Sequence, residues 1–96
     1  MAEVIFSPRF VAAAGRIFEF IASRDPGRAA EHVRLIVDGL DVLARHPLIG
    51  RPAERGMREL VLGSGRRCYV ALYRFEPSAD RVLVLTVRHA SEAGYL

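Results

Sequence analysis

The stretch RCYVALYRF, residues 67–75, decides the fold, because its apolar and aromatic side chains alternate in the way that a β-strand requires. Successive side chains of a strand point to opposite faces of the sheet. The two resulting sets are Cys68, Val70 and Leu72 on one face, and Tyr69, Ala71, Tyr73 and Phe75 on the other. Because both sets are mainly apolar, we expect both faces of this strand to be covered at least in part.

The segments on either side extend this strand into a sheet. MRELVL at 57–62 and RVLVLTVRH at 81–89 show the same two-residue period. They are separated from the central strand by GSG at 63–65 and EPSAD at 76–80, which are both rich in turn-forming residues. The pattern predicts an antiparallel meander of three strands.

A short strand and a helix are predicted at the start of the chain. EVIF at 3–6 is β-prone, and the following Ser7 and Pro8 are typical of an N-cap and a first helical position. Apolar residues then recur at helical spacing, so the first helix should run from about Pro8 to about Ser23.

A second helix is predicted after the break SRDPGR. Asp25 is its expected N-cap with Pro26 in the first position, and His46 ends it because the residue before Pro47 is pushed out of the helical region. Gly39, inside this helix, indicates close packing against the first helix.

The short break makes the two helices an antiparallel hairpin. The segment PLIGRPAERG, residues 47–56, has two prolines and two glycines and is predicted to be a loop. The expected fold is therefore α+β with the order β-α-α-β-β-β, in which the helical hairpin packs on a small, mainly antiparallel twisted sheet. The hairpin covers one face of the sheet, so the other face is expected to be a groove or a partner site.

Length and composition limit the alternatives. Ninety-six residues, 51% of them hydrophobic and 26% charged, fit a single folded domain that spans residues 1–96. No apolar run approaches the roughly 20 residues that cross a bilayer, and the start lacks the features of a secretion signal, so a cytoplasmic location and no membrane contact are expected. Cys68 has no partner for an internal disulfide, and neither a metal nor another cofactor is expected.

The basic residues are all arginine, and they are unevenly distributed. Residues 1–44 hold five arginines against six acids, whereas residues 45–96 hold nine arginines against five acids. This asymmetry favours a surface for an anionic partner, either nucleic acid or an acidic protein. The alternative is a solvated face on which the charges are merely scattered.

The chain resembles the RelE/ParE superfamily of toxins from bacterial type II toxin–antitoxin systems, which includes plasmid stabilisation proteins. The resemblance rests on four stretches in order: HPLIGRP, MRELVL, YVALYRF and VLVLTVRHASEAGY. It implies a cognate antitoxin that wraps the toxin, in a hetero-oligomer or alongside a toxin dimer. It also implies one of two targets, since RelE-like members cut messenger RNA on the ribosome and ParE-like members poison DNA gyrase.

Metal-free RNA cleavage would need a group that handles the 2′-hydroxyl proton and cations that face the phosphate. The candidates for these roles are Arg58, Arg66, Arg67, Tyr69, Arg74, Arg88, His89 and Tyr95. Val70 stands where RelE-like nucleases resemble one another in an arginine, and Arg74 after Tyr73 resembles the ParE branch. The spacing of His89 and Tyr95, however, is similar to that of the nucleases, so both targets stay open.

The expected function is a toxin that inhibits DNA gyrase by direct binding. Its target-binding residues would be Arg58, Arg67, Tyr69, Arg74, Arg88, His89 and Tyr95. In the alternative, a ribosome-dependent mRNA endonuclease, His89 or Tyr95 would handle protons while Arg58, Arg67 and Arg88 hold phosphate. A third alternative is a relic of the fold that binds an antitoxin without being toxic. In the first reading the tail ASEAGYL, residues 90–96, belongs to a target or antitoxin surface rather than to a catalytic end.

Overall fold

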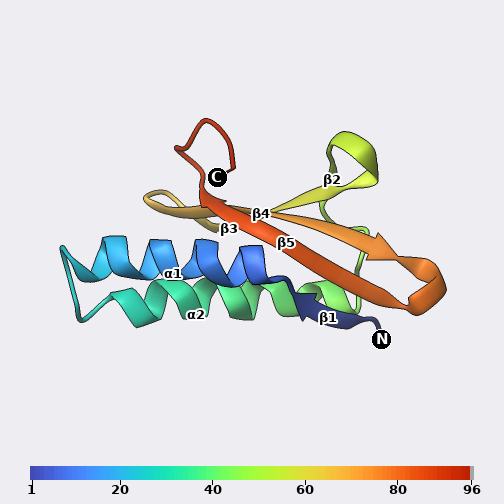
Figure 1. Ribbon diagram of the computed structural model, residues 1–96, viewed down its shortest axis with the longest axis horizontal. Coiled ribbons are helices and arrows are strands. Elements are labelled where there is room, and N and C mark those ends of the chain that lie inside the picture. Colours follow the sequence, from blue (N-terminus) through green and yellow to red (C-terminus); the bar gives the residue numbers. More distant parts are fainter. Residues whose placement is uncertain (96) are drawn as a thin grey trace.

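Five strands form one sheet in the order β1-β5-β4-β3-β2, and two helices pack against one face of it (Figure 1). The structure is a computed structural model, and it describes residues 1–95. Its elements are β1 Glu3–Phe6, α1 Pro8–Ala22, α2 Ala29–Leu40, β2 Arg51–Pro52, β3 Arg58–Ser64, β4 Arg67–Glu76 and β5 Arg81–His89. β1 pairs in parallel with β5 and the other pairings are antiparallel, so the predicted α+β class and helical hairpin are confirmed.

Ser7 caps α1 as predicted. Its hydroxyl accepts a hydrogen bond from the Phe10 amide at 3.1 Å, which satisfies one of the free N–H groups of the first turn. The same hydroxyl donates to the Leu85 carbonyl at 2.7 Å. The cap therefore also fixes the start of α1 to the neighbouring strand β5.

The predicted start of α2 at Asp25 is wrong, because the helix begins at Ala29. The residues between the two helices form a turn in which the Arg28 amide donates to the Asp25 carbonyl at 3.1 Å, and the two side chains pair at 3.5 Å. Pro26 and Gly27 lie inside this turn. Glycine has a weak helical preference, so nothing drives the helix to begin earlier.

The predicted end of the second helix at His46 is wrong, because α2 ends at Leu40 and a 3₁₀-helix, Asp41–Ala44, follows it. The predicted loop, residues 47–56, contains β2, which pairs Arg51 with Glu59 and Pro52 with Arg58, and a 3₁₀-helix, Glu54–Gly56. Sequence patterns miss this strand because it has two residues and one is proline. Proline is tolerated at the edge of a sheet, where its missing N–H faces no neighbour.

The core lies between the helices and the face of the sheet that carries Tyr69 and Tyr73. Its largest fully buried side chains are Tyr69, Tyr73, Ile36, Leu40, Leu43, Val82 and Val84, whereas the equally buried Thr86 is paired with Leu72 on the opposite face. A Cβ on Gly39 would lie 2.6 Å from the Leu62 side chain of β3, so this glycine allows α2 to approach the sheet. The expectation that Gly39 packs against the first helix is wrong.

A bulge in β5 keeps its apolar residues on the helix side. Leu72 lies opposite Thr86 and Tyr73 lies opposite Val84, so Leu85 is the extra residue. Without it, the side chains of Val84 and Val87 would point to opposite faces of the sheet, yet both belong to the core. Within residues 1–95, no helix is both long and apolar enough to cross a membrane.

Candidate functional site

The open face of the sheet, which we define as the face opposite the helices, is formed by alternate residues of β3, β4 and β5. Directly paired residues of neighbouring strands share a face, and these pairs are Glu59 with Leu72, Val61 with Val70, Val70 with Arg88 and Leu72 with Thr86. Val70 and Leu72 are 3% and 8% exposed, although no helix of residues 1–95 lies on this side. Figure 1 shows the C-terminal tail, residues 90–95, on this side of the sheet.

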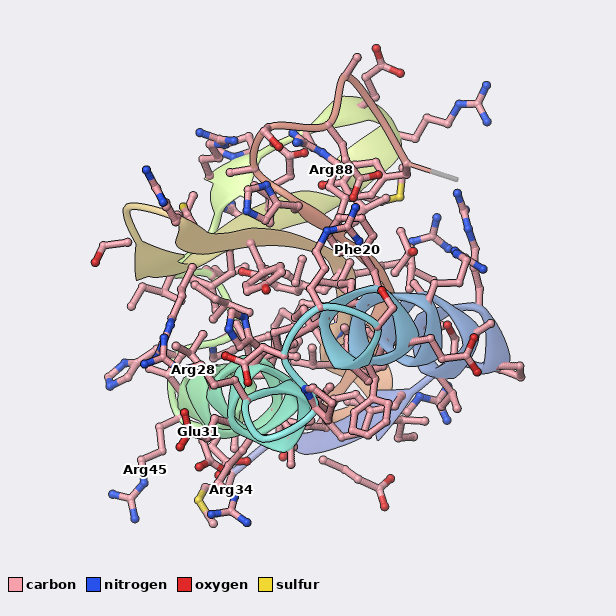
Figure 2. All side chains as sticks on the ribbon, turned by 90° about the vertical axis from the view of Figure 1, so that its left-hand side faces the viewer. Phe20, Arg28, Glu31, Arg34, Arg45 and Arg88 are labelled. Atoms are coloured by element: carbon pink, nitrogen blue, oxygen red, sulfur yellow. The ribbon has the colours of Figure 1, made fainter. Side chains whose placement is uncertain are left out.

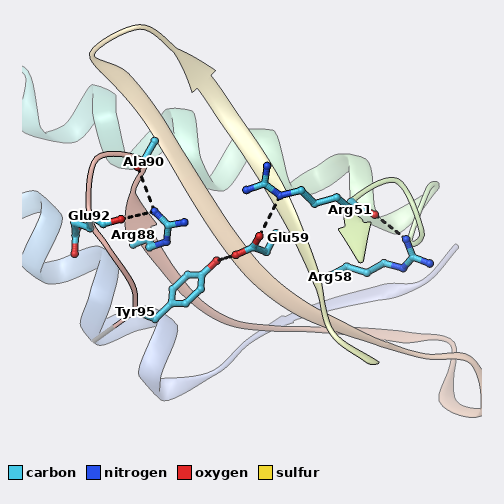
Figure 3. A network of polar contacts seen from close by, with 8 residues as sticks. Arg51, Arg58, Glu59, Arg88, Ala90, Glu92 and Tyr95 are labelled. Atoms are coloured by element: carbon cyan, nitrogen blue, oxygen red, sulfur yellow. Dashed lines mark hydrogen bonds and ion pairs between the residues drawn. The ribbon is translucent and has the colours of Figure 1, made fainter. Parts of the chain in front are cut away.

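Tyr95 fastens the tail to the open face (Figure 3). Its hydroxyl donates to Glu59 Oε2 at 2.6 Å, and its ring centroid lies 5.1 Å from the Arg88 guanidinium carbon. Glu59 is on β3 and Arg88 is on β5, so the ring crosses above β4, where Val70 and Leu72 lie. The tail thus provides the cover that the apolar open face needs.

Glu59 is held as a charged carboxylate. The hydrogen bond from Tyr95 lowers the pKa of Glu59 below 4.5, and Arg51, whose Nε donates to Oε1 at 3.1 Å, lowers it further against the opposing effect of burial. Burial and the Glu59 charge raise the pKa of Tyr95 well above 10.0. The pair therefore stays as phenol and carboxylate at neutral pH.

Arg88 fixes the beginning of the tail. Its Nη1 donates to the carbonyl oxygens of His89, Ala90 and Glu92 at 3.2, 3.3 and 2.9 Å. Nη1 has two N–H groups, so at least one of them is shared between two of these carbonyls. Arg88, which was predicted from the sequence to bind the target, thus holds the start of the tail by hydrogen bonds in this structure.

His89 lies on the other face from Arg88, although the two residues are consecutive. It is paired with Tyr69, and the two rings meet edge to face at 5.4 Å. Its Nδ1 accepts from the Ser91 amide at 3.0 Å, so Nε2 must carry the proton that is donated to the Arg66 carbonyl at 2.9 Å. Both ring nitrogens are therefore engaged in holding the tail to the β3–β4 hairpin.

Tyr69 extends this group toward α2. Its hydroxyl lies 2.7 Å from His32 Nδ1, and the residue is 2% exposed. Burial raises the pKa of Tyr69, whereas burial and the charges of Arg67 and Arg28 lower the pKa of His32. Neutral His32 is thus favoured as the partner of the phenol.

Arg58 and Arg74 lie toward the other end of the sheet. Arg58 Nη1 donates to the carbonyls of Leu48 and Gly50 at 3.2 and 2.7 Å, which anchors the loop before β2. Arg74 is exposed and is paired with Leu83. The eight sequence candidates therefore form separate groups: Arg88 and Tyr95 on the open face; Arg66, Arg67, Tyr69 and His89 at the hairpin end; and Arg58 and Arg74 at the far end.

Three residues of these groups were not among the candidates: Glu59, Arg51 and His32. The alternation of β3 could have placed Glu59 on the open face, whereas its contact with Tyr95 across 36 positions has no local signal. Among residues 1–95, the structure gathers no set of three or more His, Cys, Asp or Glu side chains that could hold a metal ion.

The comparison with protein families settles the identity of the fold. Residues 4–94 match the model of the ParE toxin of the type II toxin–antitoxin system parDE.

The chain belongs to the ParE toxin family. It is accordingly the toxin component of a type II toxin–antitoxin system, and the predicted superfamily is confirmed.

Named relatives agree with this assignment. Toxin RelE3 of Caulobacter vibrioides is 32% identical over 92 residues, which cover 96% of this chain and 98% of the relative. The chromosomal ParDE system from P. aeruginosa has a TM-score of 0.79 at 22% identity, covering 93% of this chain and 96% of that chain. The E. coli RelBE complex has a TM-score of 0.64 at 14% identity, covering 96% and 100%. At these identities the two solved structures show that this ParE-family toxin shares their fold.

Proposed function

We propose that this toxin inhibits DNA gyrase by direct binding in the cytoplasm, and that a cognate antitoxin neutralises it. The observation that carries the proposal is that the residues suited to proton transfer are already engaged. Both His89 ring nitrogens hold the tail and the hairpin, and the Tyr95 phenol is bound to Glu59.

RNA cleavage would need a base, an acid and cations around one phosphate. Here Arg88 and His89 point to opposite faces, and Arg58 anchors a loop toward the other end of the sheet. The pKa of Glu59 is lowered and that of Tyr95 is raised, so the first is a weak base and the second a weak acid at neutral pH. This arrangement supports a binding surface over a nuclease site.

Charge supports a target of negative potential. The second half of the chain carries nine arginines against five acids, and Arg74 is exposed on the open-face side. Arginines at the rim of an interface raise the association rate and make it sensitive to salt. The DNA phosphates of a gyrase–DNA complex would supply such a potential.

The antitoxin has an available strand edge. β2 pairs with β3 only at Glu59 and Arg58, so in the described chain no strand pairs with the outer edge of β3 from Leu60 to Ser64. Val61, in the middle of this edge, is 47% exposed. An extended antitoxin segment could add here as a further strand, as peptides do at open sheet edges. The solved ParDE and RelBE structures are toxin–antitoxin systems, which supports such a partner.

A paired assay on the purified toxin tests the target: supercoiling by gyrase, and integrity of mRNA on translating ribosomes. We expect gyrase to be inhibited, less so at higher salt, with the mRNA intact. Cut mRNA with unaffected gyrase would establish the nuclease instead, and no effect in either assay would favour the antitoxin-binding relic.

Matched charge reversals locate the binding surface. Arg74→Glu should weaken gyrase inhibition several-fold, because it reverses an exposed charge on the open-face side. Arg34→Glu, on the outer side of α2, is the control and should leave inhibition unchanged (Figure 2). Equal loss in both variants would show that only the overall charge matters.

A further inference from the structure

A cavity of about 510 Å³ opens at one end of the molecule. The α1–α2 turn and the β3–β4 hairpin both lie at this end (Figure 1). Its lining is mainly apolar and comes largely from α1 and β5: Ala13, Ile17, Phe20, Ile21 and Val87. Phe20 is 61% exposed, and the Arg24 guanidinium lies 4.0 Å from its ring centroid. None of the open-face residues lines this space.

Polar groups in the wall divide into two kinds. One kind is already bound to another wall residue or to the backbone, so few of its hydrogen-bonding groups are left for a ligand; it comprises Tyr69, His32 and His89. Arg16 and Arg66 also line the cavity, and within residues 1–95 neither guanidinium has a hydrogen bond or an ion pair. Glu92, the one acidic residue in the wall among the described residues, accepts from the His89 amide at 3.0 Å.

This combination is that of a ligand pocket rather than of a packing defect. Small-molecule sites have volumes of about 300 to 1,000 Å³, a mainly apolar lining and a few polar groups that orient the ligand. Two unpaired arginines at such a cavity favour a negatively charged group, which guanidinium binds bidentately when it is a carboxylate or a phosphate.

We propose that this cavity binds a small organic anion, whose apolar body fills the space beside Phe20 and Val87 and whose carboxylate or phosphate meets Arg16 and Arg66. The walls come from α1, α2, β4, β5, the hairpin and the tail, so the space is recessed at one end of the molecule. A docking helix would instead need a groove along the length of the fold.

Ligand binding should also hold the tail. Ser91 and Glu92 form part of the wall, and the same tail carries Tyr95 onto the open face. A bound anion should therefore stabilise the tail in its present position, because Ser91 and Glu92 complete the wall of the pocket only when the tail lies there. This link gives a readout that does not depend on toxicity.

The test uses two probes with the same apolar body, 4-phenylbutyrate and 4-phenylbutan-1-ol, titrated into the full-length toxin and followed by NMR. We expect shifts at the methyl groups of Ile17 and Val87, with the acid binding about tenfold more tightly than the alcohol, since a hydrogen bond to a charged group contributes roughly 1.4 kcal/mol or more. Amide exchange at Ser91 and Glu92 should slow when the acid is bound.

Variants of the cavity lining test which residues contact the charged group of the ligand and which contact its apolar body. Arg16→Gln combined with Arg66→Gln should abolish the preference for the acid and leave the alcohol's affinity unchanged, whereas Phe20→Ala should weaken both probes. Arg45→Gln, an exposed arginine apart from Phe20 in Figure 2, is the matched control and should change neither.

The proposal would be overturned by any of three outcomes. These are that neither probe shifts the Ile17 and Val87 signals, that acid and alcohol bind equally tightly, or that the double arginine variant still prefers the acid. Shifts of these signals by the antitoxin but by neither probe would likewise reject the pocket and make this surface a protein contact.

Discussion

Two tyrosines on opposite faces of the sheet, Tyr73 and Tyr95, show how differently the two faces are built. Tyr73 is 0% exposed beneath the helices, and its hydroxyl accepts a hydrogen bond from the Gly50 amide at 2.9 Å. Tyr95 is partly exposed and reaches Glu59 from a tail of a few residues. The helix side is closed by long-range packing, and the open face is closed by polar contacts that can break locally. Stability should therefore depend on the first face and adjustable binding on the second.

Removing a core side chain should have the largest effect. Leu40→Ala deletes a fully buried side chain between α2 and the sheet and should cost about 2 to 5 kcal/mol of unfolding free energy. Val61→Ala, on the open face, should cost no more than about 0.5 kcal/mol. Urea denaturation of the two variants measures both. Similar losses in the two would mean that the faces are not distinct.

The two hydroxyls allow a narrower comparison. Tyr73→Phe leaves the Gly50 amide without a partner in the interior and should cost about 1 to 3 kcal/mol. Tyr95→Phe should cost less than about 1 kcal/mol, because water can replace the phenol at a partly exposed carboxylate. Thermal unfolding compares the variants directly. A larger loss for Tyr95→Phe would show that the tail belongs to the core.

Arg88 should control the tail with a small effect on the fold. Arg88→Lys keeps the charge but removes the Nη1 group that contacts three carbonyls and the planar group beside the Tyr95 ring, so it should cost about 1 kcal/mol and speed amide exchange between Ala90 and Tyr95. The control Arg74→Lys, at an exposed position, should leave that exchange as it is. Unchanged exchange in Arg88→Lys would assign the closure of the tail to Tyr95 alone.

The contrast between the faces also explains which features the sequence could predict. Ser7, the alternation of residues 67–75 and the meander depend on local propensity and period, and each is confirmed. The return of Tyr95 to Glu59 depends on contacts that no local pattern specifies. The late start of α2 depends on competition between the preceding turn and the helix. The strand β2 has only two residues, and one of them is a proline at the edge of the sheet.

The assignment of Arg88 and His89 to one surface failed for a different reason. Period-two alternation, which placed the residues of β4 correctly, also sends consecutive residues of β5 to opposite faces. Their proximity in the sequence suggested one cluster, whereas the strand geometry separates them. Candidate residues on a strand should therefore be grouped by face before they are assigned a shared role.

The smallest predicted effect is on the pH dependence of stability, which should differ between a residue on the helix side and one on the open face. His32, on the helix side, has its pKa lowered from 6.5 by burial and by Arg67 and Arg28, so the unfolded chain binds a proton there more readily. Stability should then fall as pH drops through 6.5, until the folded protein is protonated as well. Glu59, on the open face, has its pKa lowered from 4.5, chiefly by the bond from Tyr95, so its contribution is lost at a lower pH, beginning near 4.5.

Each contribution should be below about 1 kcal/mol, because both side chains are partly exposed. Urea denaturation at pH 8, 5.5 and 3 measures the two windows. His32→Gln should reduce the loss of stability between pH 8 and 5.5 alone, and Glu59→Gln the loss between pH 5.5 and 3 alone. Each variant is the control for the other, since both remove one titrating group from an otherwise unchanged chain. If either substitution flattened both windows, the tail and the core would unfold as one unit, and the division between a stable face and an adjustable one would not hold.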